Sequence, residues 1–439
     1  MSVAPARRVA FTVIRRVLEQ GAYADRALHA EAAGAGLDPR DRALATQLAF
    51  GTIQRRRTLD HLIDALSSRP VERLDVPVRV ALELGLFQLV LLDGIPAHAA
   101  VHESVELVKR GPGGQGAAGL VNAVLRRARR EAPARLAALD DATPESAALL
   151  HSVPDELARL WFAQYGPELA RDLLGAVNRP AESSLRINTL GPPTVPLDWH
   201  AAPRWSGPGT AGAPELPEAR ILTRGVDLFA TPQWAAGEIM PQARASMLVA
   251  RTLDPRPGER VLDLCAAPGA KTTHLAALMG GQGELVAVEV HPGRAEALGR
   301  TAERMGATNV RVLCADGRRL PAELGDFDRV LVDPPCSGLG TLQSRPDIRW
   351  QNRLDHVTAL TAKQRELLDA AAARTRSGGR LVYSVCTLHH AESEAIVDAF
   401  LAARPDWRPG PRYTTLPSLD HTDGFFIAAL ERAGSTASG

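Results

Sequence analysis

The sequence predicts a doubly wound α/β domain over residues 236–432. An all-α domain over residues 1–138 and a small mixed α/β connecting domain over residues 139–235 are predicted to precede it. Helical hydrophobic spacing dominates the first part of the chain, and a Pro- and Gly-rich stretch lies between residues 192 and 217. After residue 236, short β-branched runs alternate with helix-like stretches. A chain of 439 residues is too long for one compact core.

The first domain is predicted from its apolar spacing. Apolar residues recur at helical intervals from Val9 to Leu18, and a second helical segment opens at Asp41. Residues 78–92 are apolar nearly all round, which indicates a helix at the centre of a bundle. Pro96 and the stretch 111–114 break the pattern, and residues 120–127 close the domain.

The connecting region has a helix predicted over residues 154–177 and a strand over residues 184–188. The stretch from 192 to 217 is predicted to be a loop-rich connector. Residues 433–439 are predicted to be a disordered tail because they contain only small and polar residues.

Composition excludes several classes of protein. Hydrophobic content is 45% and charged content 23%, as in soluble globular proteins. The sequence has neither a run of about 20 apolar residues nor a signal peptide, so we expect a cytoplasmic protein that spans no membrane. The four cysteines are far apart and lack zinc-ligand spacing, so we expect reduced thiols and no metal.

Positive charge is concentrated in arginines, although the net charge is only +1. The basic clusters lie at residues 7–8, 15–16, 55–57 and 126–130. Any single cluster is accounted for by a solvated helix face. Several clusters on one surface would form a footprint for nucleic acid, because arginine matches the geometry of phosphate.

Ligands of doubly wound sheets bind beyond the carboxyl ends of the strands. Five strands are predicted in the runs RVLDLC, LVAVEV, VRVLCA, DRVLVD and RLVYSV. The first strand is followed by small residues and then by a helix start. This loop consists of Cys265, Ala266, Ala267, Pro268, Gly269, Ala270 and Lys271. It is neither G-x-G-x-x-G nor a P-loop, so ligand binding and a plain tight turn are both open.

Acidic residues follow the next two strands. Glu289 can accept hydrogen bonds from both hydroxyls of a ribose, or it can be an ordinary surface acid. Asp316 can accept from the amino group of an adenine, or it can form an Asx turn. Three such features at successive strand ends are less probable by chance than any one of them. Together they favour a ligand that contains a nucleoside.

Strand four ends in Asp333-Pro334-Pro335-Cys336, and strand five is followed by Cys386. Two cysteines at the carboxyl ends of adjacent strands are predicted to face one cleft. Cys265 and Cys314 are interpreted as packing or backbone residues.

A pair of thiols suits one reaction in particular. Carbon 5 of cytosine is a poor nucleophile, but a thiolate that adds to carbon 6 makes carbon 5 enamine-like and able to attack a methyl donor. A protonated carboxyl near N3 would neutralise the base, and Asp333 is a candidate. The carbon-5 proton must then leave, and Cys336 or a water could take it.

The motifs CAAPGAK, DPPCSG and YSVCTLHHAESE resemble the RNA 5-methylcytosine methyltransferase family. Within it, the chain is similar to the bacterial RsmB (Sun/Fmu) type, which modifies 16S ribosomal RNA. The segment before residue 135, which ends in VNAVLRR, is similar to a NusB-like RNA-binding domain. LRINTL resembles the signature of the middle domain and DGFFIAALER the terminal strand.

The resemblance implies an S-adenosyl-L-methionine-dependent Rossmann-like methyltransferase that binds RNA. We expect the protein to be a monomer. The resemblance also implies that residues 265–271 hold the methionine part of the cofactor, Glu289 the ribose and Asp316 the adenine. Asp333 would contact cofactor and base, and Arg345 would lie near the substrate. Cys386 would be the nucleophile, and Cys336 would assist release.

The chain departs from the family pattern at Ala270, Val385, Ala391, Ser393 and residues 241–244. No departure removes a thiol or a cofactor acid. Three alternatives remain open: cytosine methylation in transfer RNA or at another ribosomal site, methylation of an exocyclic amino group, and a non-catalytic RNA-binding assembly factor. The second is disfavoured by Cys336, because such sites resemble Asp-Pro-Pro followed by an aromatic residue.

Overall fold

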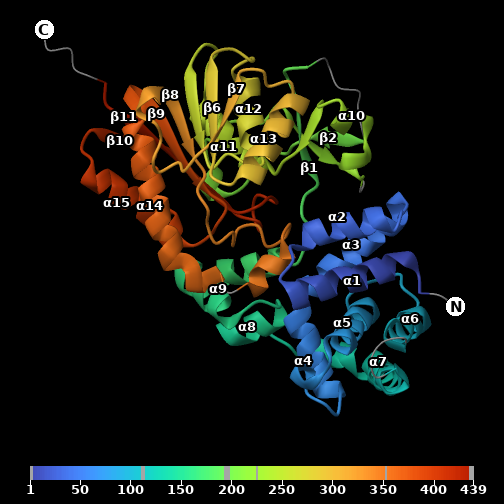
Figure 1. Cartoon of the computed structure of the whole chain (residues 1–439). Helices are drawn as coiled ribbons and strands as arrows, with labels where there is room; N and C mark the ends of the chain where they lie inside the picture. Colours follow the sequence, from blue (N-terminus) through green and yellow to red (C-terminus); the bar gives the residue numbers. More distant parts are fainter. Residues whose placement is uncertain (1–2, 110–113, 192–197, 224–225, 352, 435–439) are drawn as a thin grey trace, which may run out of the picture. The chain divides into compact units, whose positions relative to one another are not determined.

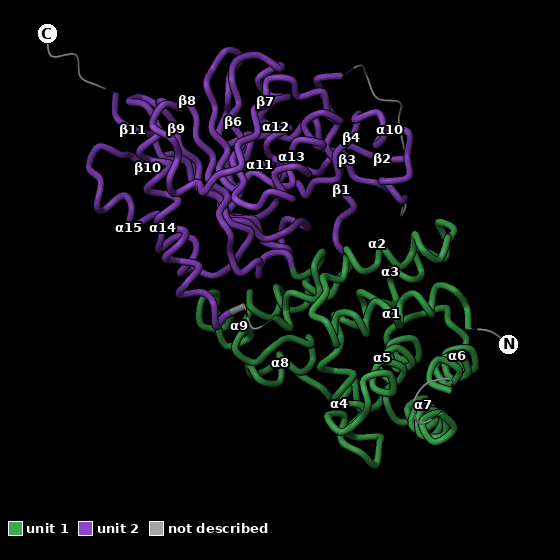
Figure 2. Tube along the Cα trace, viewed as in Figure 1, with its two compact units in different colours: residues 1–180, 342–352 green, residues 181–341, 353–439 purple. Residues whose placement is uncertain are grey.

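The computed structural model describes residues 3–109, 114–191, 198–223, 226–351 and 353–434. The chain forms two compact units, which are coloured separately in Figure 2. The first unit contains residues 1–180 and 342–352, and the second contains residues 181–341 and 353–439. A short segment that follows Cys336 in the chain is therefore part of the first unit. The three predicted domain boundaries stay a prediction.

The first unit is all-helical, as predicted, and its core is built from the apolar faces of α1 to α7. Its helices are α1 (Pro5–Gln20), α2 (Ala24–Gly34), α3 (Pro39–Gln54), α4 (Arg56–Leu66), α5 (Val76–Val90), α6 (Ala97–Lys109), α7 (Gly114–Ala137), α8 (Pro144–Leu150) and α9 (Asp155–Ala176). Figure 1 shows the first seven in blue to cyan. In the returning segment, residues Pro346–Trp350 form a 3-10 turn.

The central helix was predicted correctly. Residues 78 and 80–88 of α5 are all buried, which its all-round apolar character requires. The predicted second segment is two helices. Asp38 caps the first helix by accepting from the N–H of Asp41. The helical conformation is interrupted at Arg55, and α4 begins at the next residue. The predicted break at residues 111–114 lies largely outside the described residues.

The second unit begins with a small antiparallel sheet in the order β2-β3-β1-β4. Its strands are β1 (Ser184–Ile187), β2 (Trp199–Ala201), β3 (Ala219–Leu222) and β4 (Ile239–Pro241), and α10 (Pro232–Ala235) precedes β4. Leu185, Leu222 and Ile239 form its small apolar core. The strand predicted over 184–188 is β1.

The larger sheet has seven strands in the order β10-β11-β9-β8-β5-β6-β7. The five strands predicted from the sequence, which are β5 to β9, are parallel to one another. Its strands are β5 (Arg260–Leu264), β6 (Glu284–Glu289), β7 (Val310–Cys314), β8 (Phe327–Val332), β9 (Thr375–Val385), β10 (Trp407–Thr415) and β11 (Phe425–Arg432). The last two pair antiparallel to close one edge.

Helices cover both faces of this sheet, as Figure 1 shows in yellow to red. They are α11 (Arg244–Leu253), α12 (Ala270–Leu278), α13 (Pro292–Arg304), α14 (Val357–Ala373) and α15 (Glu394–Ala403). Val261 packs with α11 and α12, while Leu262 beside it packs with α14 and α15, since alternate strand residues point to opposite faces. The strand order reverses between β5 and β8, and ligands of such sheets bind at this reversal.

Three predictions concern features that the structure describes only in part. Most of the predicted tail, residues 433–439, lies outside the described residues. In the described ranges, no helix is long and apolar enough to cross a membrane. The same residues include no group of three His, Cys, Asp or Glu side chains that could hold a metal ion.

Candidate active site

The loop after β5 leaves the sheet and starts α12 within seven residues, from Cys265 to Lys271. Cys265 has a φ of 63° and Gly269 a φ of 105°, which an L side chain rarely adopts. A Cβ added at Gly269 would lie 2.8 Å from the side chain of Leu298. The glycine therefore lets the loop pack closely against α13 while the start of α12 faces the strand ends.

Arg186, from the LRINTL motif, fixes the start of α12. Its side chain is fully buried, and it donates to Thr273 Oγ1 at 2.8 Å and to Gln242 Oε1 at 2.9 Å. Burial lowers the pKa of Arg186 to about 9. The small sheet thus holds the loop through a buried charge.

The two predicted nucleoside-binding acids lie at neighbouring strand ends, since Glu289 pairs in register with Cys314 on β7. Glu289 is 3% exposed and accepts from the N–H of His291 at 3.0 Å. Asp316 forms an Asx turn, in which it accepts from the N–H of Arg318, and it also accepts from the guanidinium of Arg318. The guanidinium, followed by the backbone N–H, lowers the pKa of Asp316 to about 2. The turn and a ligand contact are compatible, because the carboxylate is partly exposed.

Asp263, within β5, is a site residue that the sequence interpretation missed. It is 1% exposed; Thr272 donates to its Oδ2 at 2.7 Å, and its Oδ1 has no partner among the described residues. Burial raises its pKa to about 7; the hydrogen bond from Thr272 opposes this shift and the charge of Asp333 adds to it. An unpartnered carboxylate oxygen under the loop favours a cationic ligand above it.

The two cysteines meet, as predicted. Cys336 Sγ lies 3.3 Å from Cys386 Sγ, and neither cysteine is in a disulfide. The hydrogen bond to Cys386, followed by burial, raises the pKa of Cys336 well above its usual value. A raised pKa favours the protonated form of Cys336, although either sulfur can be the donor in this contact. Burial raises the pKa of Cys265 to about 12, which agrees with a packing role.

Asp333 lies beside the cysteines with both oxygens occupied. Lys271 Nζ donates to Oδ2 at 2.7 Å, and Ser384 Oγ donates to Oδ1 at 2.9 Å. Burial lowers the pKa of Lys271, but the charge and hydrogen bond of Asp333 outweigh it, so the pKa is raised overall. Lys271 thus joins the loop after β5 to the strand end that carries Asp333.

Glu392 ties the two cysteine loops together, and the sequence interpretation did not single it out. It is fully buried; Ser337 N–H donates to Oε1 at 2.8 Å and Thr387 Oγ1 donates to Oε2 at 3.2 Å. Gln364 also donates to Oε1, at 3.0 Å. Ser337 and Thr387 directly follow Cys336 and Cys386, so this carboxylate fixes both thiols through their neighbours.

Sequence signals for the missed residues were weak. Glu392 lies between Ala391 and Ser393, two departures from the family pattern, and is the acid that this stretch retains. Arg345, predicted to lie near substrate, is exposed and belongs to the first unit. The functional roles of all these residues stay predictions.

The doubly wound domain belongs to the class of methyltransferases, as its match to a family model shows. Residues 250–431 match the family described as 16S rRNA methyltransferase RsmB/F, and residues 4–130 match the NusB family. The chain belongs to the RsmB/F family of 16S rRNA methyltransferases, as its relatives along nearly the whole length show.

Two relatives illustrate the similarity. The ribosomal RNA small subunit methyltransferase B of Thermus thermophilus is 38% identical over 91% of this chain and 90% of its own length. That of Vibrio cholerae is 32% identical over 97% of both chains.

Solved structures agree with these matches. The crystal structure of the protein PH0851 superposes with a TM-score of 0.81 at 25% identity, over 98% of this chain and 100% of the other. NSun6 from Pyrococcus horikoshii with SFG shares the fold, with a TM-score of 0.54 at 22% identity over 65% of this chain and all of its own.

Proposed function

We propose that this protein transfers a methyl group from S-adenosylmethionine to carbon 5 of a cytosine in 16S ribosomal RNA, through a covalent bond between Cys386 and the base. The observation that carries the proposal is the 3.3 Å separation of two thiols beside the carboxyl group of Asp333. A family of known methyltransferases supplies the reaction class.

Cys386 is the proposed nucleophile. Its sulfur adds to carbon 6 of the cytosine, and carbon 5 gains the electron density that it needs to take up a methyl group. Cys336, whose raised pKa keeps it protonated, donates a hydrogen bond that stabilises negative charge on the attacking sulfur. The two thiols therefore have different roles although they lie side by side.

Cys336 is proposed to act again when the product leaves. Once the sulfur of Cys386 is bonded to carbon, it loses both the hydrogen bond that raises the pKa of Cys336 most and the charge that adds to this shift. Cys336 can then give its proton to a water molecule, and the resulting thiolate accepts the proton of carbon 5. The bond between Cys386 and carbon 6 breaks as that proton leaves, and the free enzyme is regenerated.

Asp333 is proposed to contact the base at N3 and to relay to it the proton that N3 requires, which Lys271 donates to Oδ2. Lys271 and Ser384 fix the orientation of its carboxyl group. The substrate base must be turned out of its stack to reach these groups, as in other enzymes that modify a base.

The residues after β5, β6 and β7 fit S-adenosylmethionine, which supplies the methyl group and carries positive charge. Residues 265–271 and the unpartnered oxygen of Asp263 suit its methionine part. Glu289 suits the ribose hydroxyls and Asp316 the adenine. An acidic set of this kind favours a cation and disfavours a phosphate-bearing dinucleotide.

The RNA substrate is inferred from the relatives, whose names specify the small-subunit ribosomal RNA. The helical first unit, which matches the NusB family, is proposed to bind RNA. Action as a monomer in the cytoplasm, where thiols stay reduced, is part of the same proposal.

The test is bisulfite sequencing of 16S ribosomal RNA from cells with and without this protein. We expect one cytosine to resist conversion only when the protein is present. If conversion of 16S ribosomal RNA is identical in both samples and a protein-dependent modified cytosine is found in transfer RNA, the substrate is transfer RNA and not 16S ribosomal RNA. Loss of a methyl group on an exocyclic nitrogen would refute the covalent mechanism.

A further inference from the structure

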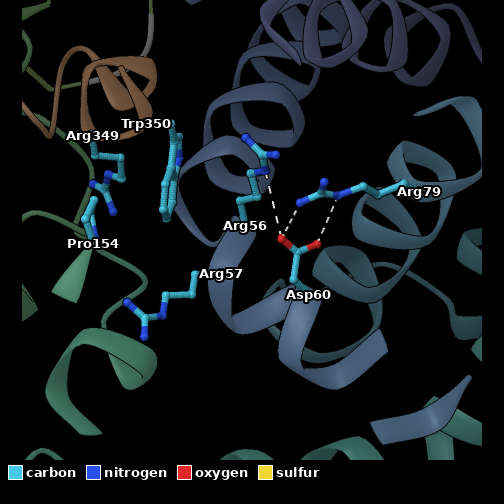
Figure 3. Close-up of a pocket in the computed structure, with 7 residues that line it drawn as sticks. All are labelled: Arg56, Arg57, Asp60, Arg79, Pro154, Arg349 and Trp350. Carbon is cyan, nitrogen blue, oxygen red and sulfur yellow. Dashed lines mark hydrogen bonds and ion pairs between the residues drawn. The ribbon is translucent and has the colours of Figure 1, made fainter. Parts of the chain in front are cut away.

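A pocket of about 330 Å³ lies within the first unit, and arginines dominate its wall. Figure 3 shows its seven lining residues, which are Arg56, Arg57, Asp60, Arg79, Pro154, Arg349 and Trp350. Asp60 is the one carboxylate in this set, so positive charge is in excess. The pocket combines α4, α5, the turn before α9 and the returning segment that carries Arg349 and Trp350.

Three of the four arginines have a carboxylate within ion-pair distance, and two of them donate hydrogen bonds to it. Arg79 binds Asp60 through two nitrogens and donates to Glu83 at 2.8 Å. Arg57 donates to Asp155 at 2.7 Å and to the carbonyl of Val153 at 2.8 Å. The ion pairs and hydrogen bonds of Arg57 and Arg79 stabilise the first unit, so these two arginines need no ligand to account for them.

Arg349 has no such partner. It is 2% exposed, and its two terminal nitrogens donate only to four backbone carbonyls and to Asn178 Oδ1. Its Nε has no acceptor, and no described carboxylate lies within ion-pair distance. Burial, followed by the charge of Arg55, lowers its pKa to about 9. A buried cation beside another cation is costly unless an anion compensates it.

Arg56 is the arginine of the pocket whose guanidinium is available to donate hydrogen bonds to a bound anion. It forms an ion pair with Asp60 at 3.9 Å, a distance too long for a hydrogen bond, and the same Oδ2 is also bound by Arg79. No described group accepts a hydrogen bond from its guanidinium, which lies 5.9 Å from the ring centre of Trp350 (Figure 3). Trp350 is itself fixed, because its Nε1 donates to the carbonyl of Ile53 at 2.7 Å.

We propose that this pocket binds a phosphate group of the RNA backbone, with Arg56 as the principal donor. The planar guanidinium matches phosphate geometry, and the adjoining indole offers a surface on which a neighbouring nucleobase can stack. Arg349, a buried residue of the pocket lining, contributes positive charge. This proposal rests on the proposed function for the identity of the RNA, and it assigns a site to the arginine cluster at residues 55–57.

The test compares wild type, Arg56→Gln and Arg56→Lys for binding to a 16S ribosomal RNA transcript at several salt concentrations. Removal of one phosphate contact is expected to weaken binding on the order of 10-fold at low salt. It should also reduce the slope of log affinity against log salt by about 0.7 to 0.9. Arg135→Gln, an exposed arginine of α7 outside the pocket, is the matched control and should bind as wild type does.

Arg56→Lys guards against a misfolded glutamine variant. It keeps the charge, so its salt slope should equal that of wild type, while affinity falls several-fold because an ammonium lacks the planar pair of donors. Thermal unfolding confirms that each variant is folded. Folded Arg56→Gln with wild-type affinity and slope would overturn the proposal.

Two further probes separate the sources of the anion. If inorganic phosphate raises the Tm of wild type but not of Arg56→Gln while both bind RNA equally, the pocket takes free phosphate and the RNA assignment is wrong. If polyglutamate competes with RNA as well as polyphosphate does, the ligand is an acidic peptide. Methyl transfer by wild type tests the proposed function separately, because it does not depend on which arginine holds the backbone.

Discussion

Lys271 Nζ lies 2.7 Å from Asp333 Oδ2, so the residue that ends the loop after β5 is paired with the carboxylate that ends β8. Both side chains are largely buried. A buried ion pair contributes little when compared with an apolar pair, but the loss of one partner leaves an uncompensated charge. The pair therefore makes the loop that is proposed to hold the cofactor and the loop that carries Cys336 depend on each other.

Lys271→Met is expected to lower the free energy of unfolding by about 3 kcal/mol, because Asp333 loses its charge partner. Asp333→Asn should lower it as well, and the double variant should be less destabilised than the sum of the two. Urea denaturation of the four proteins measures this coupling. Strictly additive effects would show that the pair does not link the two loops.

Asp263→Asn should have a pH-dependent effect on stability. The folded-state pKa of Asp263, about 7, lies above its unfolded value, so the native state keeps a proton that the unfolded state loses between about pH 4 and pH 7. The stability of wild type should therefore fall as pH rises through this window. The asparagine variant does not lose stability in this way. The free energy of unfolding of the variant, relative to that of wild type, should therefore rise from pH 4 to pH 8 by at most roughly 4 kcal/mol.

Urea unfolding of both proteins at pH 4, 6 and 8 measures that difference, and a constant difference would contradict a buried carboxyl with a raised pKa. The same variant tests the proposed cation site. Binding of S-adenosylmethionine to wild type should tighten as pH rises through 7, and this dependence should be absent from Asp263→Asn in calorimetric titrations.

Glu392→Gln is expected to reduce kcat at least 10-fold with a smaller change in KM. An amide group cannot accept at both ends, so a donor from Ser337 or Thr387 loses its partner and the neighbouring cysteine shifts. Glu394→Gln, two residues further along, is the matched control. Steady-state methyl transfer measures both, and equal losses in the two variants would mean that Glu392 is merely structural.

The sequence predicts the central sheet well because its strands are short, β-branched and separated by helices, a pattern that few other folds produce. It misses α2, which is rich in alanine and has few large apolar residues to mark its buried face. It also misses β10, an edge strand interrupted by Pro409 and Pro411, because proline is tolerated where the N–H group needs no partner.

The site was predictable where its residues stand at strand ends. Cys336 and Cys386 could be brought together from topology alone, because adjacent parallel strands end at the same edge. Asp263 and Glu392 could not, since their roles depend on partners from other segments. Nothing in the sequence indicates that residues 342–352 belong to the first unit, since that assignment comes from packing around Arg349.

The central claim is that the sulfur of Cys386 forms a covalent bond to the cytosine. Cys336→Ala should still form this bond but should release the product slowly, so a protein–RNA adduct should accumulate. The most direct measurement is denaturing electrophoresis of Cys336→Ala with labelled 16S ribosomal RNA and S-adenosylmethionine, followed by mass spectrometry of the attached peptide. We predict a shifted band whose modified peptide contains Cys386, and no band from the double variant Cys336→Ala/Cys386→Ala. A band that persists in the double variant, or methyl transfer by Cys386→Ala at the wild-type rate, would contradict the account.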